Sequence, residues 1–594
     1  MDARHNMHRT DSCAEGGFAK TSARFGVVTA QGGWRKVTWG VVAGVAAVAT
    51  AGSLMAPSAA IAAEWVDVGG TQYNAGTAAG DDAGTWKWDG ADDMKLNGYN
   101  GSAIKAEGKL NVNYSGNNTV TNGDGRGVLV MDGANENAEL NIKGDASSTL
   151  NVTSSGDAIM SAGDINIDGA GTVNATSTKA DAIDAKGDLT IKGSGNVNAA
   201  GDSDGIRADG NITIDSSGTV TAKATEDQGI EAGEKLTIKG GGKVEASSIE
   251  DNAIQADGNI EISGGSQVKA NSEEDYAVKA YGGLTVTNAS LNAYGVGYGV
   301  YTYKGVTLDG ATVTVRASAG NDEASALFTD EDDIFIKNGS IVDAFAEGQF
   351  STAISTRNYN PNEAGGHIYI SDSVVKAIAR YVEIGGDGPD HYSNDQSGEI
   401  TPEHRGVNIG IFARTSEGIT PATISIVRSK VTAEGDAAAI FALAMSADGK
   451  AIGTIEIEGA TILTPEGGKV IDYRNKEELD DGIMYEAGQT IGTGDAVVDS
   501  PYNEAVAKST VIAPPEETKP EANPEEAKPV VKPAKQQTLV TGAKAEPAEA
   551  KKSLPATGDA SQVGFAATAF AGVAAAFASL AALLAGFVAR RKRE

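Results

Sequence analysis

Residues 204–222 read DGIRADGNITIDSSGTVTA, and residues 228–246 read QGIEAGEKLTIKGGGKVEA. Both copies hold three short runs in which apolar residues alternate with polar ones, and Gly, Asp and Ser separate the runs. Alternation with a period of two is typical of a strand with one buried face. The pair of copies therefore predicts a repeated unit of three strands rather than a helical repeat.

The repeat extends on both sides of these two copies. The first isoleucine of each copy is an anchor residue that recurs every 22 to 24 residues, as Ile159, Ile183, Ile206, Ile230, Ile254, Val278 and Val300. Three strands and their tight turns fill one coil of a three-sided solenoid, in which successive coils stack ~4.8 Å apart. We therefore predict an all-β fold, a right-handed single-stranded parallel β-helix of about 14 turns.

Weaker copies lengthen the solenoid, at Ile104 and Val128 and then at Leu327, Ile354, Ile411, Ile440 and Val470. A polar excursion, residues 381–405, interrupts it. Trp86 and Trp88 precede the first coil and share one face of a strand, so we expect them to pack in a cap, although a sugar platform is the alternative. The predicted divisions are a signal peptide (1–63), an N-terminal cap (64–101), the β-helix (102–470), a C-terminal cap (471–512), a linker (513–553) and a sorting signal (554–594).

Both ends of the sequence predict export. Residues 1–63 combine basic residues with an apolar run that ends in small residues, as a removed secretory signal does. Residues 513–553 are rich in Pro and charge, cannot bury a core, and predict a disordered, extended stalk that crosses the cell wall. The only cysteine, Cys13, lies in the signal, so no disulfide is expected.

The C-terminus resembles a sortase sorting signal. The motif is Leu554, Pro555, Ala556, Thr557 and Gly558, and it is followed by an apolar stretch (563–589) and a basic tail (590–593). The resemblance implies a transmembrane sorting helix that holds the chain in the membrane only before sorting. It also implies cleavage between Thr557 and Gly558 by sortase, and covalent linkage of Thr557 to the peptidoglycan of a Gram-positive bacterium. We therefore expect a secreted protein of the cell wall and cell surface.

The charge of the chain narrows its partners. Asp and Glu number 80 against 48 Lys and Arg, a net charge of −32. Such a surface repels nucleic acid and anionic membranes and attracts divalent cations. We therefore expect no nucleic-acid partner.

Acidic residues recur two to four residues before the anchor residue, so the stacking of the coils aligns them in ladders. Two carboxylates ~4.8 Å apart repel by roughly 3–4 kcal/mol at an effective dielectric constant of 20. Calcium relieves this repulsion through carboxylate and carbonyl oxygens, whereas we expect protonation to do so only at acidic pH. The candidate Ca²⁺ ligands are Asp157, Asp181, Asp202, Asp204, Glu226, Asp227, Glu250, Asp251, Glu274 and Asp275. A solvated acidic face without a fixed ion is the alternative.

Tyrosines crowd into two coils of a chain with only 6% aromatic residues. The candidate carbohydrate-binding residues are Tyr276, Tyr281, Tyr298 and Tyr301. An outward tyrosine stacks on a sugar ring and hydrogen-bonds through its hydroxyl. Stacking of the tyrosines on one another, as a structural ladder, is the alternative.

Turns such as DAIDAKGDLTIKGSGNVNA and DGIRADGNITIDSSGTVTA, preceded by WKWDG and LNGYNGSAI, resemble a calcium-binding parallel β-helix family of carbohydrate-binding domains from cellulose-degrading bacteria. The resemblance implies binding of acidic or cellulosic polysaccharide with calcium, and it assigns the calcium ligands to Asp157, Asp181 and Asp204. The sequence departs from that pattern in later coils. The same position there holds Gln228, Asn252 and Tyr276.

Three functions follow from these features. The first is non-catalytic, calcium-dependent binding of a polysaccharide or glycan at the cell surface. The second is an adhesin or passive scaffold that binds host or protein ligands. The third is a polysaccharide lyase, for which Arg207 or Lys279 would be the base; no feature marks either as activated, so we predict no enzyme.

Overall fold

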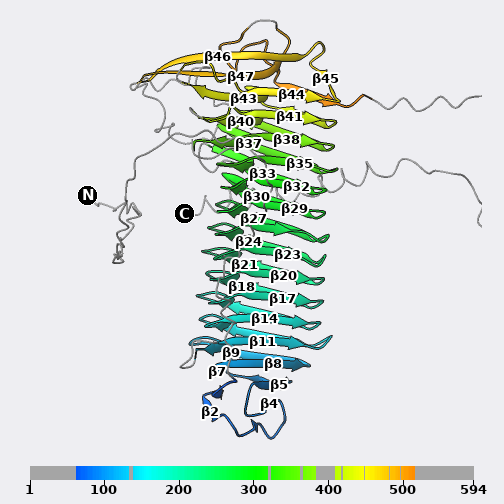
Figure 1. Ribbon diagram of the computed structural model, residues 1–594. Coiled ribbons are helices and arrows are strands. Elements are labelled where there is room, and N and C mark those ends of the chain that lie inside the picture. Colours follow the sequence, from blue (N-terminus) through cyan, green and yellow to red (C-terminus); the bar gives the residue numbers. More distant parts are fainter. Residues whose placement is uncertain are drawn as a thin grey trace, which may run out of the picture. The chain divides into compact units, whose positions relative to one another are not determined.

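The computed structural model describes residues 62–132, 138–318, 323–360, 365–382, 408–416, 419–446, 448–479, 482–494 and 497–515. These residues form strands and no helix, and all of the strands belong to three long sheets. The coil with the opening motif has one strand in each sheet: β19 (Ile206–Ala208), β20 (Ile212–Ser216) and β21 (Thr219–Lys223). Figure 1 shows the coils stacked one above another, with their strands in register. This arrangement is that of a parallel β-helix, as the repeat predicts.

The sheet that contains β19 confirms the predicted alignment of the repeat. Its strands pair in parallel from β7 (Ile104–Glu107) through β16 (Ile183–Ala185), β22 (Ile230–Ala232) and β28 (Val278–Ala280) to β43 (Ala438–Ser446). At every step the anchor residue of one coil lies opposite the anchor of the next, from Ile104 to Ile440. Sequence spacing alone therefore identified the register.

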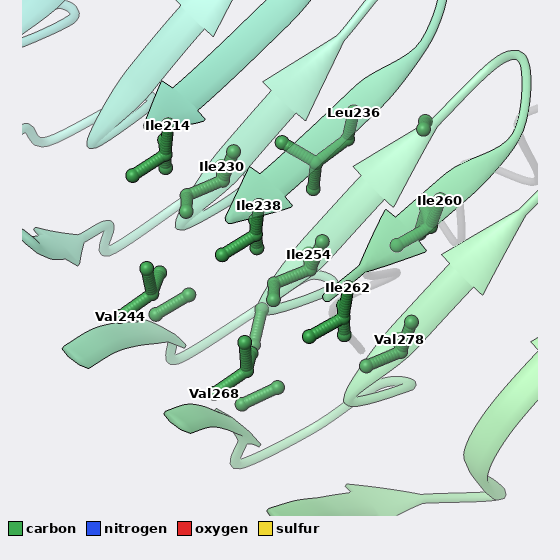
Figure 2. Packing of buried hydrophobic residues seen from close by; sticks show 14 of the residues in the cluster. Ile214, Ile230, Leu236, Ile238, Val244, Ile254, Ile260, Ile262, Val268 and Val278 are labelled. Carbon is green, nitrogen blue, oxygen red and sulfur yellow. The ribbon is translucent and has the colours of Figure 1, made fainter. Parts of the chain in front are cut away.

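The core is a set of aliphatic ladders inside the solenoid. Ile206, Ile212, Ile214 and Val220 are buried, whereas Arg207 and Thr213, which alternate with buried residues along the strands, are partly exposed. Figure 2 shows the corresponding side chains of neighbouring coils packed together, among them Ile230, Ile238 and Ile254. Full burial of each such side chain contributes ~1.5–3 kcal/mol. Because every coil repeats the pattern, the core continues across the coil boundaries.

Turn glycines allow the coils to approach closely. A Cβ atom at Gly218 would lie 2.0 Å from the carbonyl oxygen of Gly195 in the preceding coil. Real Cβ atoms do not approach an oxygen so closely, so a side chain at Gly218 would push the two coils apart. This contact gives a physical reason for the glycine of the DSSG segment.

Antiparallel strands end the parallel series at both ends. β1 (Trp65–Val68) pairs antiparallel with β2 (Thr71–Asn74) and β7. Trp86 and Trp88 of β4 (Trp86–Trp88) are buried beside this cap, which confirms cap packing and argues against a sugar platform there. The antiparallel pairing covers the edge of the sheet that contains β7 at this end.

The expected parallel coil at Val470 is wrong. Val470 belongs to β46 (Lys469–Leu479), which pairs antiparallel with β47 (Gly482–Gly492), and β47 in turn pairs antiparallel with β43. An apolar alternation of period two fits either strand direction, so the sequence pattern did not distinguish them. β48 (Ser509–Ala513) pairs antiparallel with β42 (Lys430–Glu434) and β45 (Thr461–Thr464).

Several predicted segments lie outside the described residues. These are the whole sorting signal and nearly all of the signal peptide, the linker and the 381–405 excursion. Within the residues that the structure describes, no helix is long and apolar enough to cross a membrane.

Candidate functional site

The aspartates that precede the anchors lie at the turn into the sheet of β16 and β19, and they are buried. Asp181 Oδ1 accepts a hydrogen bond from the backbone N–H of Asp204 at 3.0 Å. Asp204 Oδ1 accepts one from the backbone N–H of Gln228 at 2.8 Å. Each carboxylate thus satisfies a backbone donor of the next coil, which gives the repeated aspartate a structural role whether or not an ion is bound.

Three buried carboxylates come together in two neighbouring coils. Asp157, Asp181 and Asp184 each offer an oxygen, and the three oxygens lie within 4.8 Å of one another. The structure therefore unites two predicted ligands with one that sequence reasoning missed. Asp184 follows the anchor Ile183 directly. The sequence does mark this position, because the residue after the anchor is charged in successive coils: Asp184, then Arg207, then Glu231.

Two cations already contact this carboxylate group. Arg126 Nε lies 2.6 Å from Asp157 Oδ2, and Lys186 Nζ lies 2.9 Å from Asp184 Oδ1. Three carboxylates facing two cations leave a negative excess when all are ionised. Carboxylate oxygens are the donors that calcium prefers, so the set fits a calcium ion if the remaining ligands are carbonyls or water.

Burial opposes ionisation of this carboxylate ladder. It raises the pKa of Asp181 and of Asp184, and the neighbouring carboxylates act in the same direction. Burial, together with the charges of Asp181 and Glu231, raises the pKa of Asp204 to about 8. The expectation that protonation relieves the repulsion only at acidic pH is therefore wrong for Asp204, because that group holds a proton near neutral pH without a cation.

The other predicted calcium ligands serve mainly as turn residues. Asp227 Oδ2 accepts a hydrogen bond from the Ser203 hydroxyl, and Asp275 Oδ1 accepts one from the backbone N–H of Tyr276. Within the described parts of the chain, the only other group of three acids whose oxygens all lie within 4.8 Å of one another is Asp89, Asp92 and Asp93, in the predicted N-terminal cap. The predicted ligands outside both groups are Asp202, Asp204, Glu226, Asp227, Glu250, Asp251, Glu274 and Asp275.

Three of the predicted sugar-binding tyrosines pack on one another. The Tyr276 ring lies 4.8 Å from that of Tyr298 and 5.5 Å from that of Tyr301. Tyr301 is only 8% exposed, and its hydroxyl donates to Asp330 at 3.0 Å. Burial raises the pKa of Tyr298 and of Tyr301. These contacts are those of a structural ladder, the alternative that the sequence left open.

Tyr281 differs from the other three. Its side chain is 43% exposed, and its ring stacks nearly parallel on that of Tyr303 in the next coil, with 5.4 Å between centroids and an interplanar angle of 8°. Lys279 Nζ lies 5.3 Å from the centre of the Tyr281 ring. The exposed part of this ring, next to a cation, is suited to contact with the apolar face of a sugar ring. Tyr303 was not among the predicted binding residues, although it lies 22 residues after Tyr281, at the repeat spacing.

The two candidate lyase bases have other contacts. Arg207 is 3.3 Å from Asp209 and 3.1 Å from Glu231, and these carboxylates help raise its pKa. Lys279 lies over the rings of Tyr276 and Tyr281. An arginine held in two ion pairs is a poor proton acceptor.

The fold and these contacts define a class, a parallel β solenoid that carries a buried acidic turn and an accessible aromatic pair. No protein family model, no curated protein and no solved structure matches the chain. The function is therefore argued from the side chains themselves.

Proposed function

We propose that the protein is a non-catalytic glycan-binding protein of a Gram-positive cell wall, built on a right-handed parallel β-helix of about 14 coils. The observation that carries the proposal is the Tyr281–Tyr303 pair. Tyr281 is 43% exposed on an otherwise regular rod, although its ring stacks on Tyr303. A pyranose bound at this pair would cover the exposed part of the Tyr281 ring.

Calcium is part of this proposal. Asp157, Asp181 and Asp184 would hold the ion, since their oxygens already converge. A bound cation would neutralise a buried carboxylate group that otherwise relies on Arg126, Lys186 and protonation. Its chemistry would be electrostatic stabilisation of these turns.

The anchoring part of the proposal rests on the sequence. The LPATG motif, the apolar stretch and the basic tail occur in the order that sorting requires, so sortase would join Thr557 to peptidoglycan. An extended linker of 41 residues (513–553) would hold the solenoid away from the wall, at most ~130 Å at ~3.1 Å per residue.

A matched pair of variants tests glycan binding. Tyr281→Ala removes the accessible ring, and Tyr359→Ala removes a tyrosine of similar exposure, 47%, that lies beside Arg357 and Arg414 instead. On a glycan array, Tyr281→Ala is expected to lose the wild-type signal and Tyr359→Ala to keep it. Equal signals from both variants would remove the tyrosine pair from the site. A blank array for the wild type, with binding to host proteins instead, would favour the adhesin.

A further inference from the structure

A hollow of about 180 Å³ opens beside the tyrosine pair, at the corner between two sheets. The hollow arises at one position of the repeat. This position directly precedes the strand that each coil contributes to the sheet of β20. This position holds Asn259, then Gly283, then Gly305, then Asp333, as the hydrogen bonds between neighbouring coils align them. Two successive glycines remove the side chains from a stretch of the corner. The opening from Asn259 to Asp333 spans three coil steps, about 14 Å.

The hollow and the residues next to it in the chain carry groups of the kinds that bind sugars in proteins. Thr285 of β29 (Leu284–Thr287) and Thr307 of β32 (Val306–Asp309) line the hollow, two residues after the glycines, and are partners in the parallel register. Their hydroxyl groups donate and accept hydrogen bonds. Tyr281 and Tyr303 lie two residues before the glycines and do not line the hollow itself.

A second stacked aromatic pair lies at the end of the hollow. Phe335 of β35 (Ile334–Lys337) lines the hollow and is the register partner of Thr307. Its ring is 38% exposed and stacks on Tyr369 of β38 (Ile368–Ser371), with 5.0 Å between centroids and an interplanar angle of 11°. Four successive coils thus contribute one aromatic ring each, in two stacked pairs.

The charges around the hollow favour an uncharged ligand. Lys304 forms an ion pair with Glu331 at 2.7 Å, which leaves Asp332 and Asp333 as the remaining charged groups of the wall. Burial raises the pKa of Asp333, but Asp332 lies beside it, so the wall carries a negative excess. A carboxylate or sulfate on the ligand would be repelled.

We propose that this glycine gap is a subsite for a neutral pyranose oligosaccharide. One sugar ring stacks on Phe335, a neighbouring unit stacks on Tyr281, and Thr285 and Thr307 hydrogen-bond to the hydroxyls between them. The inference rests on the proposed glycan binding and adds the ligand class and a second aromatic contact. It predicts that acidic saccharides bind more weakly than neutral ones.

Calorimetric titration with cellohexaose and with a six-unit galacturonate oligomer tests this subsite, in calcium-containing buffer. The wild type is expected to bind cellohexaose more tightly. Phe335→Ala should weaken that binding about five- to tenfold, the equivalent of ~1–1.4 kcal/mol, and Thr307→Val about threefold because it removes one hydroxyl without changing the shape. Phe350→Ala is the matched control, since Phe350 is also 38% exposed but does not line the hollow. Its affinity should remain within twofold of the wild type.

Each other outcome contradicts the subsite. If Tyr281→Ala loses binding while Phe335→Ala and Thr307→Val retain it, the glycine gap is not a subsite, although glycan binding stands. Equal or tighter binding of the galacturonate oligomer would refute the neutral ligand. If the wild type does not bind cellohexaose, the inference fails, and array signals from other glycans then decide the proposed function separately. Circular dichroism of Phe335→Ala and of Phe335→Tyr, which keeps the ring and should keep binding, distinguishes lost contacts from lost fold.

Discussion

Tyr281 lies flat against Tyr303, one coil further along the chain, and Tyr301 lies edge-on to Tyr303 with 5.2 Å between their ring centroids. Two kinds of tyrosine therefore meet at this corner. Tyr281 is 43% exposed, whereas Tyr301 is buried and hydrogen-bonded to Asp330. Both are tyrosines of neighbouring coils, so residue type alone does not separate a binding surface from a structural ladder.

Substitution should separate the two roles. Tyr301→Ala removes a buried ring and leaves Asp330 without its hydroxyl donor, so we expect a loss of about 3 kcal/mol in stability. Tyr281→Ala should cost less than about 1 kcal/mol and weaken glycan binding instead. Thermal unfolding and glycan titration of both variants check this division. A Tyr281 variant as unstable as the Tyr301 variant would mean that both rings serve the fold.

The aliphatic ladders should respond strongly to cavities. Ile230 is fully buried between Ile206 and Ile254, so Ile230→Ala is expected to cost about 2–5 kcal/mol. Thr237→Ala changes an outward position of the same coil and should cost under about 1 kcal/mol. Denaturant unfolding compares the two variants. Similar midpoints would show that the packing of this ladder contributes little.

Stability without metal should fall as the pH rises. The carboxyl of Asp204 titrates near ~3.9 when unfolded and at about 8 when folded. The folded state therefore binds its proton more tightly, so the stabilising contribution is complete below pH ~4 and is lost as the pH rises towards 8.

Asp204→Asn tests this linkage, because the amide keeps an oxygen for the Gln228 N–H and does not ionise. Asn252 already occupies the equivalent position two coils later. In the presence of chelator, the variant should gain stability over the wild type between pH 5 and 9, by a few kcal/mol at most. A difference between the two proteins that does not change with pH would contradict the raised pKa.

Calcium should stabilise the wild type through the buried carboxylate group. A ligand that binds only the folded state raises its stability, by about 2.7 kcal/mol at a hundred times Kd. Asp184→Asn should abolish most of the calcium-dependent shift in Tm. Asp188 lies outside this group and accepts a hydrogen bond from the Asn211 N–H, so Asp188→Asn should retain the shift. Equal shifts in both variants would place the ion elsewhere.

The fold could be predicted closely because stacking makes one position in the repeat equal to one position in space. Ile206 and Ile230 are 24 residues apart in the sequence and opposite each other in the sheet. The last coil could not be predicted in the same way, since the apolar alternation around Val470 suits parallel and antiparallel strands equally.

The candidate site was predicted less completely. The position of Asp181 followed from the repeat, but the convergence of Asp184 with Asp157 and Asp181 depends on side-chain positions that the spacing does not give. The glycine gap was missed because Gly283 and Gly305 are inconspicuous among 76 glycines. Only the alignment of Asn259 and Asp333 with these glycines reveals that two side chains are absent where their neighbours have one.

A glycan array probed with the wild-type protein, first with calcium and then with chelator, tests glycan binding most directly. We predict signals on pyranose oligosaccharides in calcium, strongest on neutral chains and weaker after chelation. An array that stays blank in calcium, with a folded protein confirmed by circular dichroism, would contradict the glycan-binding function.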